Sequence, residues 1–124
     1  MPFLCPDCGS MSLSIVQSIE LPYDARSDEI TLQIVECAGC RFSGIAVYEE
    51  SRRGGLDSES VDHRGYRVSS KVLGTLKRAI SRCPRPREPR CGCRTHAALG
   101  GRNDIGRWDW IQRTEVGESF RMIL

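Results

Sequence analysis

Residues 29–48 read EITLQIVECAGCRFSGIAVY, a stretch in which a cysteine pair separates two segments rich in apolar residues. In the first segment, Ile30, Leu32 and Ile34 occupy alternate positions, which predicts a strand with one buried face. The short β-branched run at 44–48 predicts a further strand. Between them, the Cys-Ala-Gly-Cys sequence at 37–40 predicts a tight knuckle.

A second cysteine pair, Cys5-Pro-Asp-Cys8, is separated from Cys37 by 28 residues. The alternation in residues 11–21 predicts a strand, and the polar residues 22–28 predict a turn. Two strands and a turn would bring the knuckles side by side, with Gly9 and Gly39 supplying backbone freedom. Four thiolates are what a tetrahedral structural metal site requires. The predicted ligands are Cys5, Cys8, Cys37 and Cys40.

These motifs, CPDCG at 5–9 and CAGC at 37–40, resemble those of the zinc-ribbon superfamily over about the first 50 residues. The resemblance implies one zinc ion held between two knuckles that a small antiparallel sheet connects. The second knuckle departs from the common C-x-x-C-G pattern, because Arg41 replaces the glycine. Iron remains an alternative to zinc, although the aromatic-rich core of rubredoxins is missing. A redox role for the dithiols is a further alternative.

The second half of the chain contains one helical pattern, at about 70–82, which Ser69 or Ser70 could cap at its N-terminus. Its apolar residues recur at helical spacing and comprise Val72, Leu73, Leu76 and Ile80. Residues 84–104 show no periodicity and are expected to be irregular. The alternation near Trp108 and the apolar end of the chain predict a C-terminal β-hairpin.

A second group of candidate metal ligands lies within 14 residues and comprises Cys83, Cys91, Cys93 and His96. Three thiolates and one imidazole match a Cys3His zinc site. His63 is a competing fourth ligand, and three unliganded thiols are the alternative to a metal site. Seven cysteines are an odd number, so a closed set of disulfides cannot use them all. Together with one histidine, they complete two four-ligand sites.

The net charge of +2 conceals a division of the chain. Residues 1–62 hold 4 basic and 11 acidic residues, whereas residues 63–124 hold 14 basic and 5 acidic ones. Arginine suits bidentate phosphate recognition, and Trp108 and Trp110 could stack on unpaired bases. The predicted nucleic-acid-binding residues flank the second ligand group: Arg82, Arg85, Arg87, Arg90, Arg94 and Arg102. The alternative is a protein-interaction module or adaptor, or self-association through the opposite charges.

The predicted fold class is α+β, with a zinc ribbon at 1–50, a linker or mobile loop at 51–68, and a helix plus Cys/His loop subdomain at 69–124. No apolar run approaches the roughly 20 residues of a transmembrane helix, and the first residues do not resemble a signal peptide. We therefore expect a cytoplasmic protein without a membrane or small-molecule partner.

We expect no enzyme activity, because a site closed by four protein ligands has no open coordination position. A zinc hydrolase would require an open second site with a base such as Glu88 or Asp104. The sequence contains neither an H-E-x-x-H motif nor the deaminase pattern.

Overall fold

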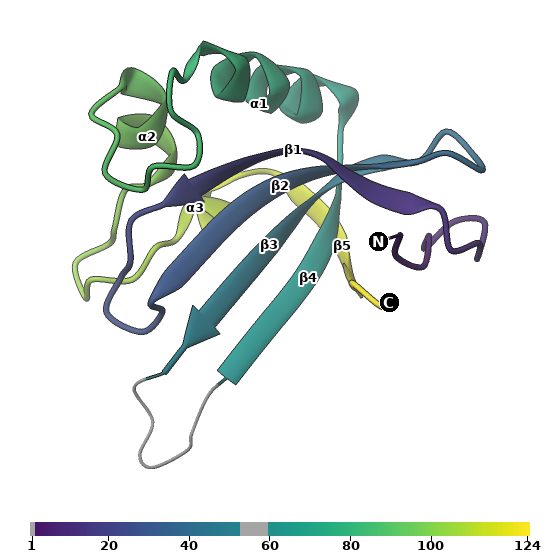
Figure 1. The fold of residues 1–124 in the computed structure, drawn as a ribbon, viewed down its shortest axis with the longest axis horizontal. Helices are drawn as coiled ribbons and strands as arrows, with labels where there is room; N and C mark the ends of the chain where they lie inside the picture. Colours follow the sequence, from purple (N-terminus) through teal and green to yellow (C-terminus); the bar gives the residue numbers. More distant parts are fainter. Residues whose placement is uncertain (1, 53–59) are drawn as a thin grey trace.

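A single antiparallel sheet of five strands forms the centre of the computed structural model, which describes residues 2–52 and 60–124 (Figure 1). Each strand pairs with the next along the chain, in the order β1-β2-β3-β4-β5. The strands are β1 (Leu13–Leu21), β2 (Glu29–Cys37), β3 (Ser43–Ser51), β4 (Ser60–Val68) and β5 (Val116–Arg121). The predicted α+β class and the first three predicted strands are confirmed.

Strand β2 shows why the alternating pattern produces this sheet. Ile30, Leu32 and Ile34 point to one face and join the larger hydrophobic core, while Val35 and Cys37 join a smaller core on the other face. Because β2 is covered on both faces at one end, Ile34 and the adjacent Val35 are both fully buried. The strand therefore connects the two cores of the molecule.

The helices cover one face of the sheet (Figure 1). They are α1 (Ser70–Arg82), α2 (Arg94–Leu99) and α3 (Trp110–Arg113). The predicted helix is α1, whose first turn is capped by Ser69: the Ser69 hydroxyl accepts a hydrogen bond from the Val72 amide at 3.2 Å. Its buried residues lie on one stripe and pack on the larger core: Leu73, Leu76 and Ile80.

The N-terminal segment lies against the opposite face at one end of the sheet. Phe3 forms an isolated antiparallel bridge with Leu13, and both residues are buried. They belong to the smaller core, which also contains Val35, Phe42, Ala46 and two cysteines, Cys5 and Cys37. This core holds the first cysteine pair beside the end of β2.

Three expectations for the second half of the sequence are corrected. Ser60–Val68, placed in a predicted linker, forms β4, Ser51 of that linker ends β3, and its residues 53–59 lie outside the described residues. The expected C-terminal strand exists as β5, but it pairs with β4, and residues 110–113 form a helical turn instead of a hairpin partner. Residues 94–99, expected to be irregular, form α2.

Asp24, in the loop between β1 and β2, is 1% exposed and joins distant parts of the chain. Its carboxylate accepts hydrogen bonds from the backbone amides of Arg26, Ser27 and Trp108 at 2.7–2.9 Å. Arg107 forms an ion pair with it at 2.6 Å. Although burial acts to raise the pKa of Asp24, the amides of Ser27, Trp108 and Arg26 and the charge of Arg107 lower it overall.

Among the residues that the structure describes, no helix is both long and apolar enough to span a membrane.

Candidate metal centres

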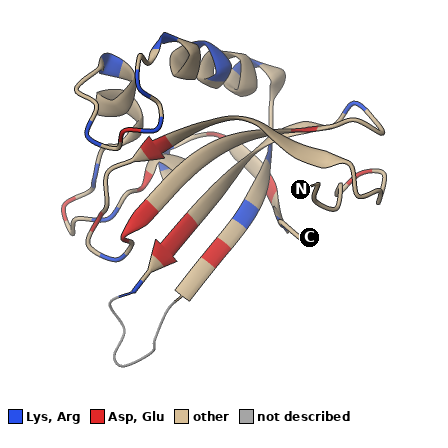
Figure 2. Ribbon diagram, viewed as in Figure 1, with Lys and Arg blue, Asp and Glu red and all other residues tan. Residues whose placement is uncertain are grey.

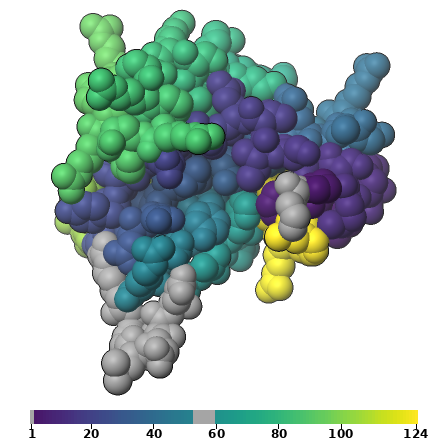
Figure 3. Space-filling model, in the orientation of Figure 1, coloured from purple at the N-terminus to yellow at the C-terminus, as the bar shows by residue number. Residues whose placement is uncertain are grey.

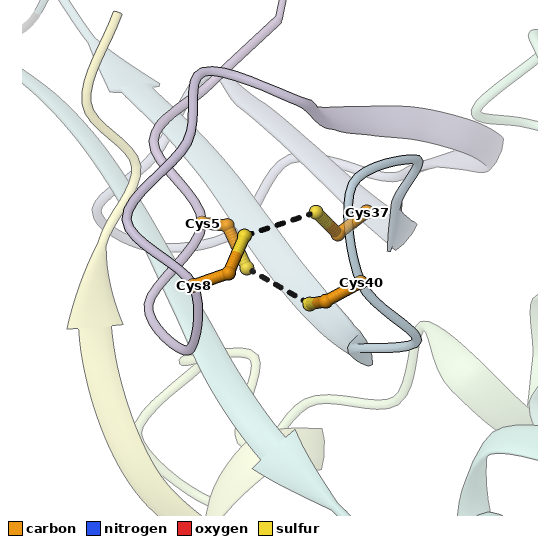
Figure 4. A group of neighbouring side chains, drawn as sticks. All are labelled: Cys5, Cys8, Cys37 and Cys40. Atoms are coloured by element: carbon orange, nitrogen blue, oxygen red, sulfur yellow. Dashed lines mark hydrogen bonds between the residues drawn. The ribbon is translucent and has the colours of Figure 1, made fainter.

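The first cysteine group, called site 1, comprises Cys5, Cys8, Cys37 and Cys40. The N-terminal knuckle supplies Cys5 and Cys8, while Cys37 ends β2 and Cys40 lies in the turn before β3. Cys5 Sγ lies 3.7 Å from Cys40 Sγ, and Cys8 Sγ lies 3.7 Å from Cys37 Sγ (Figure 4). All four sulfurs point toward one centre and lie within 4.8 Å of one another.

Local backbone features hold the two knuckles of site 1. Gly9 adopts a φ of 73°, a conformation that favours glycine, and its amide donates to the Cys5 carbonyl at 3.1 Å. Gly39 is not among the described glycines with positive φ, contrary to expectation. A Cβ on Gly39 would lie 2.9 Å from the Ser10 hydroxyl, so this glycine provides space for the opposite knuckle.

The sulfurs of site 1 fit a tetrahedral metal ion. With metal–sulfur bonds of about 2.3 Å, tetrahedral thiolates lie about 3.8 Å apart, close to the 3.7 Å of the Cys5–Cys40 and Cys8–Cys37 pairs. Backbone amides also donate to the sulfurs, from Gly39 to Cys37 at 3.3 Å and from Phe42 to Cys40 at 3.4 Å. Such hydrogen bonds stabilise thiolate charge. The donor set therefore suits a thiophilic metal ion.

The second group, called site 2, comprises Cys83, Cys91, Cys93 and His96. Cys83 is the C-cap of α1 and Cys93 the N-cap of α2, so the site joins the ends of both helices. Cys83 Sγ lies 3.9 Å from Cys91 Sγ and 3.5 Å from Cys93 Sγ. The four ligand atoms lie within 4.8 Å of one another, as in site 1.

His96 is oriented as a metal-binding histidine would be. Its Nε2 lies 2.9 Å from the backbone carbonyl of Glu20, an acceptor that requires Nε2 to carry the proton. Its Nδ1 lies 3.3 Å from Cys83 Sγ and 3.2 Å from Cys93 Sγ. Metal-ligating histidines commonly donate their second ring N–H to a carbonyl or carboxylate. The Glu20 carbonyl therefore fixes the tautomer that directs Nδ1 into site 2.

The other histidine lies elsewhere. His63 belongs to β4, where its Nε2 lies 2.7 Å from Gln33 Oε1, and its ring makes edge contacts with Phe3 and Tyr48. Burial lowers the pKa of His63. The structure thus brings His96, and not His63, to the three cysteines of the second group.

The thiols of the two sites differ in acidity. Hydrogen bonds from the Ser10 hydroxyl and amide lower the pKa of Cys8 to about 6. The amide and ring of His96 lower the pKa of Cys93 to about 6, whereas burial raises that of Cys83 to about 11. Because a bound metal ion requires every ligand to be deprotonated, binding would release protons, and acid would favour metal release.

The six predicted nucleic-acid-binding arginines are all exposed: Arg82, Arg85, Arg87, Arg90, Arg94 and Arg102. None forms an ion pair within residues 2–52 and 60–124, although the Arg102 guanidinium lies over the Tyr23 ring, 5.3 Å from its centroid. Basic residues gather on α1 and the following loop, and acidic ones toward the strand ends across the sheet (Figure 2).

The two tryptophans have different environments. Trp108 is buried in the larger core, and its indole N–H donates to the Leu99 carbonyl at 2.6 Å. Trp110 is partly buried against the same core. Trp108 is therefore a core residue and not a stacking surface for bases.

No protein-family model, curated protein or solved structure matches the chain.

Replacing Cys91 and Cys93 with serine together is expected to remove one of two bound metal ions and leave the other. The two sites share no ligand, and site 1 is built on the opposite end of β1 from the Glu20 carbonyl. Metal content per chain, measured by mass spectrometry, tests this expectation, with Ser81→Ala and Ser119→Ala together as the control. Loss of both ions from the Cys91/Cys93 variant would contradict the independence of the sites.

Proposed function

We propose that the protein is a non-enzymatic, nucleic-acid-binding module with two structural zinc sites. Its binding surface would be the arginine-rich loop, defined as residues 82–94. The observation that carries the proposal is the cluster of exposed arginines on this loop, none of which has an ion-pair partner in the described part of the chain. Site 2 lies in the same loop and connects the end of α1 to the start of α2.

Zinc is proposed because of the donor sets. Four thiolates, or three thiolates and one imidazole, are the usual ligands of structural zinc. Four protein ligands also leave no coordination position for a substrate, which argues against catalysis at either metal. Elemental analysis distinguishes zinc from iron, and a four-thiolate iron centre would in addition colour the protein.

Phosphate binding is proposed because of the chemistry of the loop. Guanidinium groups form bidentate hydrogen bonds with phosphate oxygens. Because these arginines form no ion pair with the described residues, binding a phosphate would break none. Pro84, Pro86 and Pro89 restrict the loop, and the Glu20 amide donates to the Pro86 carbonyl at 2.7 Å. Since the loop is restrained before binding, less conformational entropy would be lost on a nucleic-acid backbone.

The proposal predicts salt-dependent binding of single-stranded oligonucleotides. Replacing Arg85, Arg87 and Arg90 together with alanine should weaken binding at 50 mM salt by at least about tenfold. The plot of log affinity against log salt should also become shallower by about 2, because each lost phosphate contact changes the slope by about 0.7. Fluorescence anisotropy with a labelled 12-mer measures both quantities.

The matched control is Arg121→Ala, which removes an exposed arginine from β5. For each charge removed, it should change the affinity and the salt-dependence slope by less than half as much as the triple variant does. If the zinc-loaded wild-type chain binds no oligonucleotide at low salt, the nucleic-acid proposal is wrong. The protein-interaction module then becomes the better description.

A further inference from the structure

A cleft of about 400 Å³ lies beside the arginine-rich loop. One wall is formed by the end of β1 and the start of β2, including Glu20 and Thr31, and the other by the loop residues 88–90. In the space-filling view, the green surface of the second half lies directly against the dark blue surface of these first-half strands (Figure 3). The volume is in the range of small-ligand sites, about 300–1,000 Å³.

Glu20 lines this cleft, and its backbone is held at two points. Its backbone amide donates to the Pro86 carbonyl at 2.7 Å, and its carbonyl accepts from His96 Nε2 at 2.9 Å. Its side chain has no hydrogen-bond or ion-pair partner within the described part of the chain. An unpartnered carboxylate on a fixed backbone is suited to accept hydrogen bonds from a ligand.

The cleft also contains groups that suit a base and its phosphate. Tyr23 is 51% exposed, and the Arg102 guanidinium lies 5.3 Å from its ring centroid. Aromatic rings and guanidinium planes are the surfaces on which unpaired bases stack. Arg90 and Arg102 line the same cleft and offset part of the negative charge of its four carboxylates, Glu20, Asp28, Glu29 and Glu88.

Building on the proposed nucleic-acid function, we propose that this cleft receives one unpaired base that carries an exocyclic amino group. The amino group would donate to the Glu20 carboxylate, the base would stack at Tyr23, and the adjoining phosphates would contact Arg90 and Arg102. The arginine-rich loop supplies affinity for any strand, and the cleft supplies a preference among bases.

The preference follows from the hydrogen-bonding edges of the bases. An ionised carboxylate only accepts hydrogen bonds. Cytosine and adenine each present an amino donor, and guanine presents an amino group beside a ring N–H. Thymine and uracil present a single N–H between two carbonyl oxygens, and these oxygens would repel the carboxylate. Oligomers of cytosine should therefore bind more tightly than oligomers of thymine, which are of similar size and equal charge.

The experiment compares three labelled 12-mers with the zinc-loaded full chain: oligo(dC), oligo(dT) and an abasic strand with the same phosphates. Wild-type protein should prefer oligo(dC) over oligo(dT) by about tenfold, as one good hydrogen-bonded contact to a base allows. Glu20→Gln should reduce this ratio to about one, because an amide both donates and accepts. The backbone contacts of Glu20 remain available in this variant.

The matched control is Glu118→Gln, which removes the same charge from an exposed position on β5. It should retain the preference for oligo(dC). If Glu20→Gln also retains it, the cleft proposal is wrong while the proposed function stands. If the abasic strand binds as tightly as oligo(dC), the phosphates account for all binding and the cleft proposal again fails. If no strand binds, the proposed function itself fails.

Discussion

Replacing Cys37 with serine is expected to abolish metal binding at site 1 and the cooperative unfolding of the chain. Cys37 contributes twice, since its sulfur belongs to site 1 and its side chain is buried in the smaller core beside Leu13 and Val35. Structural zinc sites contribute roughly 10–16 kcal/mol to folding, whereas the total stability of a domain is about 5–15 kcal/mol. The variant should therefore lack a sharp thermal transition by circular dichroism.

The control for this prediction is Ser14→Ala, on an exposed position of β1 next to the same end of the sheet. It should retain both metal ions and a melting temperature close to that of the wild type. A Cys37→Ser variant that retained two metal ions per chain, or that unfolded as cooperatively as the wild type, would contradict the structural role assigned to site 1.

Replacing Asp24 with alanine is expected to reduce the free energy of unfolding by about 3–5 kcal/mol, the cost of removing one partner from a buried charge pair. The substitution would leave the buried amides of Ser27 and Trp108 without their acceptor and Arg107 with only its longer ion pair, to Glu49 at 3.8 Å. It would thereby weaken the connection between the loop before α3 and the β1–β2 loop, which the hydrogen bond from the Ala25 amide to the Gly106 carbonyl at 2.8 Å also maintains. Chemical denaturation at pH 7 measures the loss.

The pH dependence of this difference provides a second readout. Because folding lowers the pKa of Asp24, its stabilising contribution is complete above the ordinary value of about 3.9 and is lost as pH falls through the lower folded value. The stability difference between the wild type and Asp24→Ala should therefore be constant at pH 5–7 and shrink only below about pH 4. Both proteins share the metal sites, so metal release at low pH affects them alike.

Asp104→Ala serves as the matched control because Asp104 is exposed and has no ion-pair partner among the described residues. It should change stability by less than about 0.5 kcal/mol. If the free energies of unfolding of the wild type and Asp24→Ala differ by less than about 1 kcal/mol at pH 7, water replaces the lost acceptor.

Local patterns predicted much of the fold. The alternating apolar residues of β2 and the apolar stripe of α1 predicted which side chains are buried, because the period of a strand or helix determines which residues share a face. The cysteine spacing identified both groups of candidate ligands, because two close cysteines and a tight turn suffice to bring thiolates together. In site 2, the spacing also favoured the correct histidine over His63.

Strand β4 was missed because its sequence, SVDHRGYRV, carries polar and charged residues on both faces. It lies between β3 and β5, so its strand character comes from backbone pairing on both sides and not from an apolar pattern. Gly65 shows the dependence on a distant partner: the Phe120 ring of β5 occupies the space where a Cβ of Gly65 would lie. Local sequence patterns do not predict such a pairing between residues distant in sequence.

Helix α2 and Asp24 were missed for a related reason. The six residues of α2 are too few for a periodic pattern, and the helix depends on Cys93, whose sulfur accepts a hydrogen bond from the His96 amide at 3.4 Å. Asp24 belongs to a stretch that predicts only a polar turn. Its partners, Arg107 and Trp108, are more than 80 residues away, and no spacing rule connects them.

The pairing of each strand with its neighbour in sequence has a consequence for the order of assembly during synthesis. When residue 52 has left the ribosome, β1, β2 and β3 are complete, and so are all four ligands of site 1. Since chains begin to fold from the N-terminus as they emerge, a metal ion could close site 1 before any residue of the helical layer has left the ribosome. The second half of the chain is then expected to fold onto a sheet of β1, β2 and β3 that a metal ion at site 1 already stabilises.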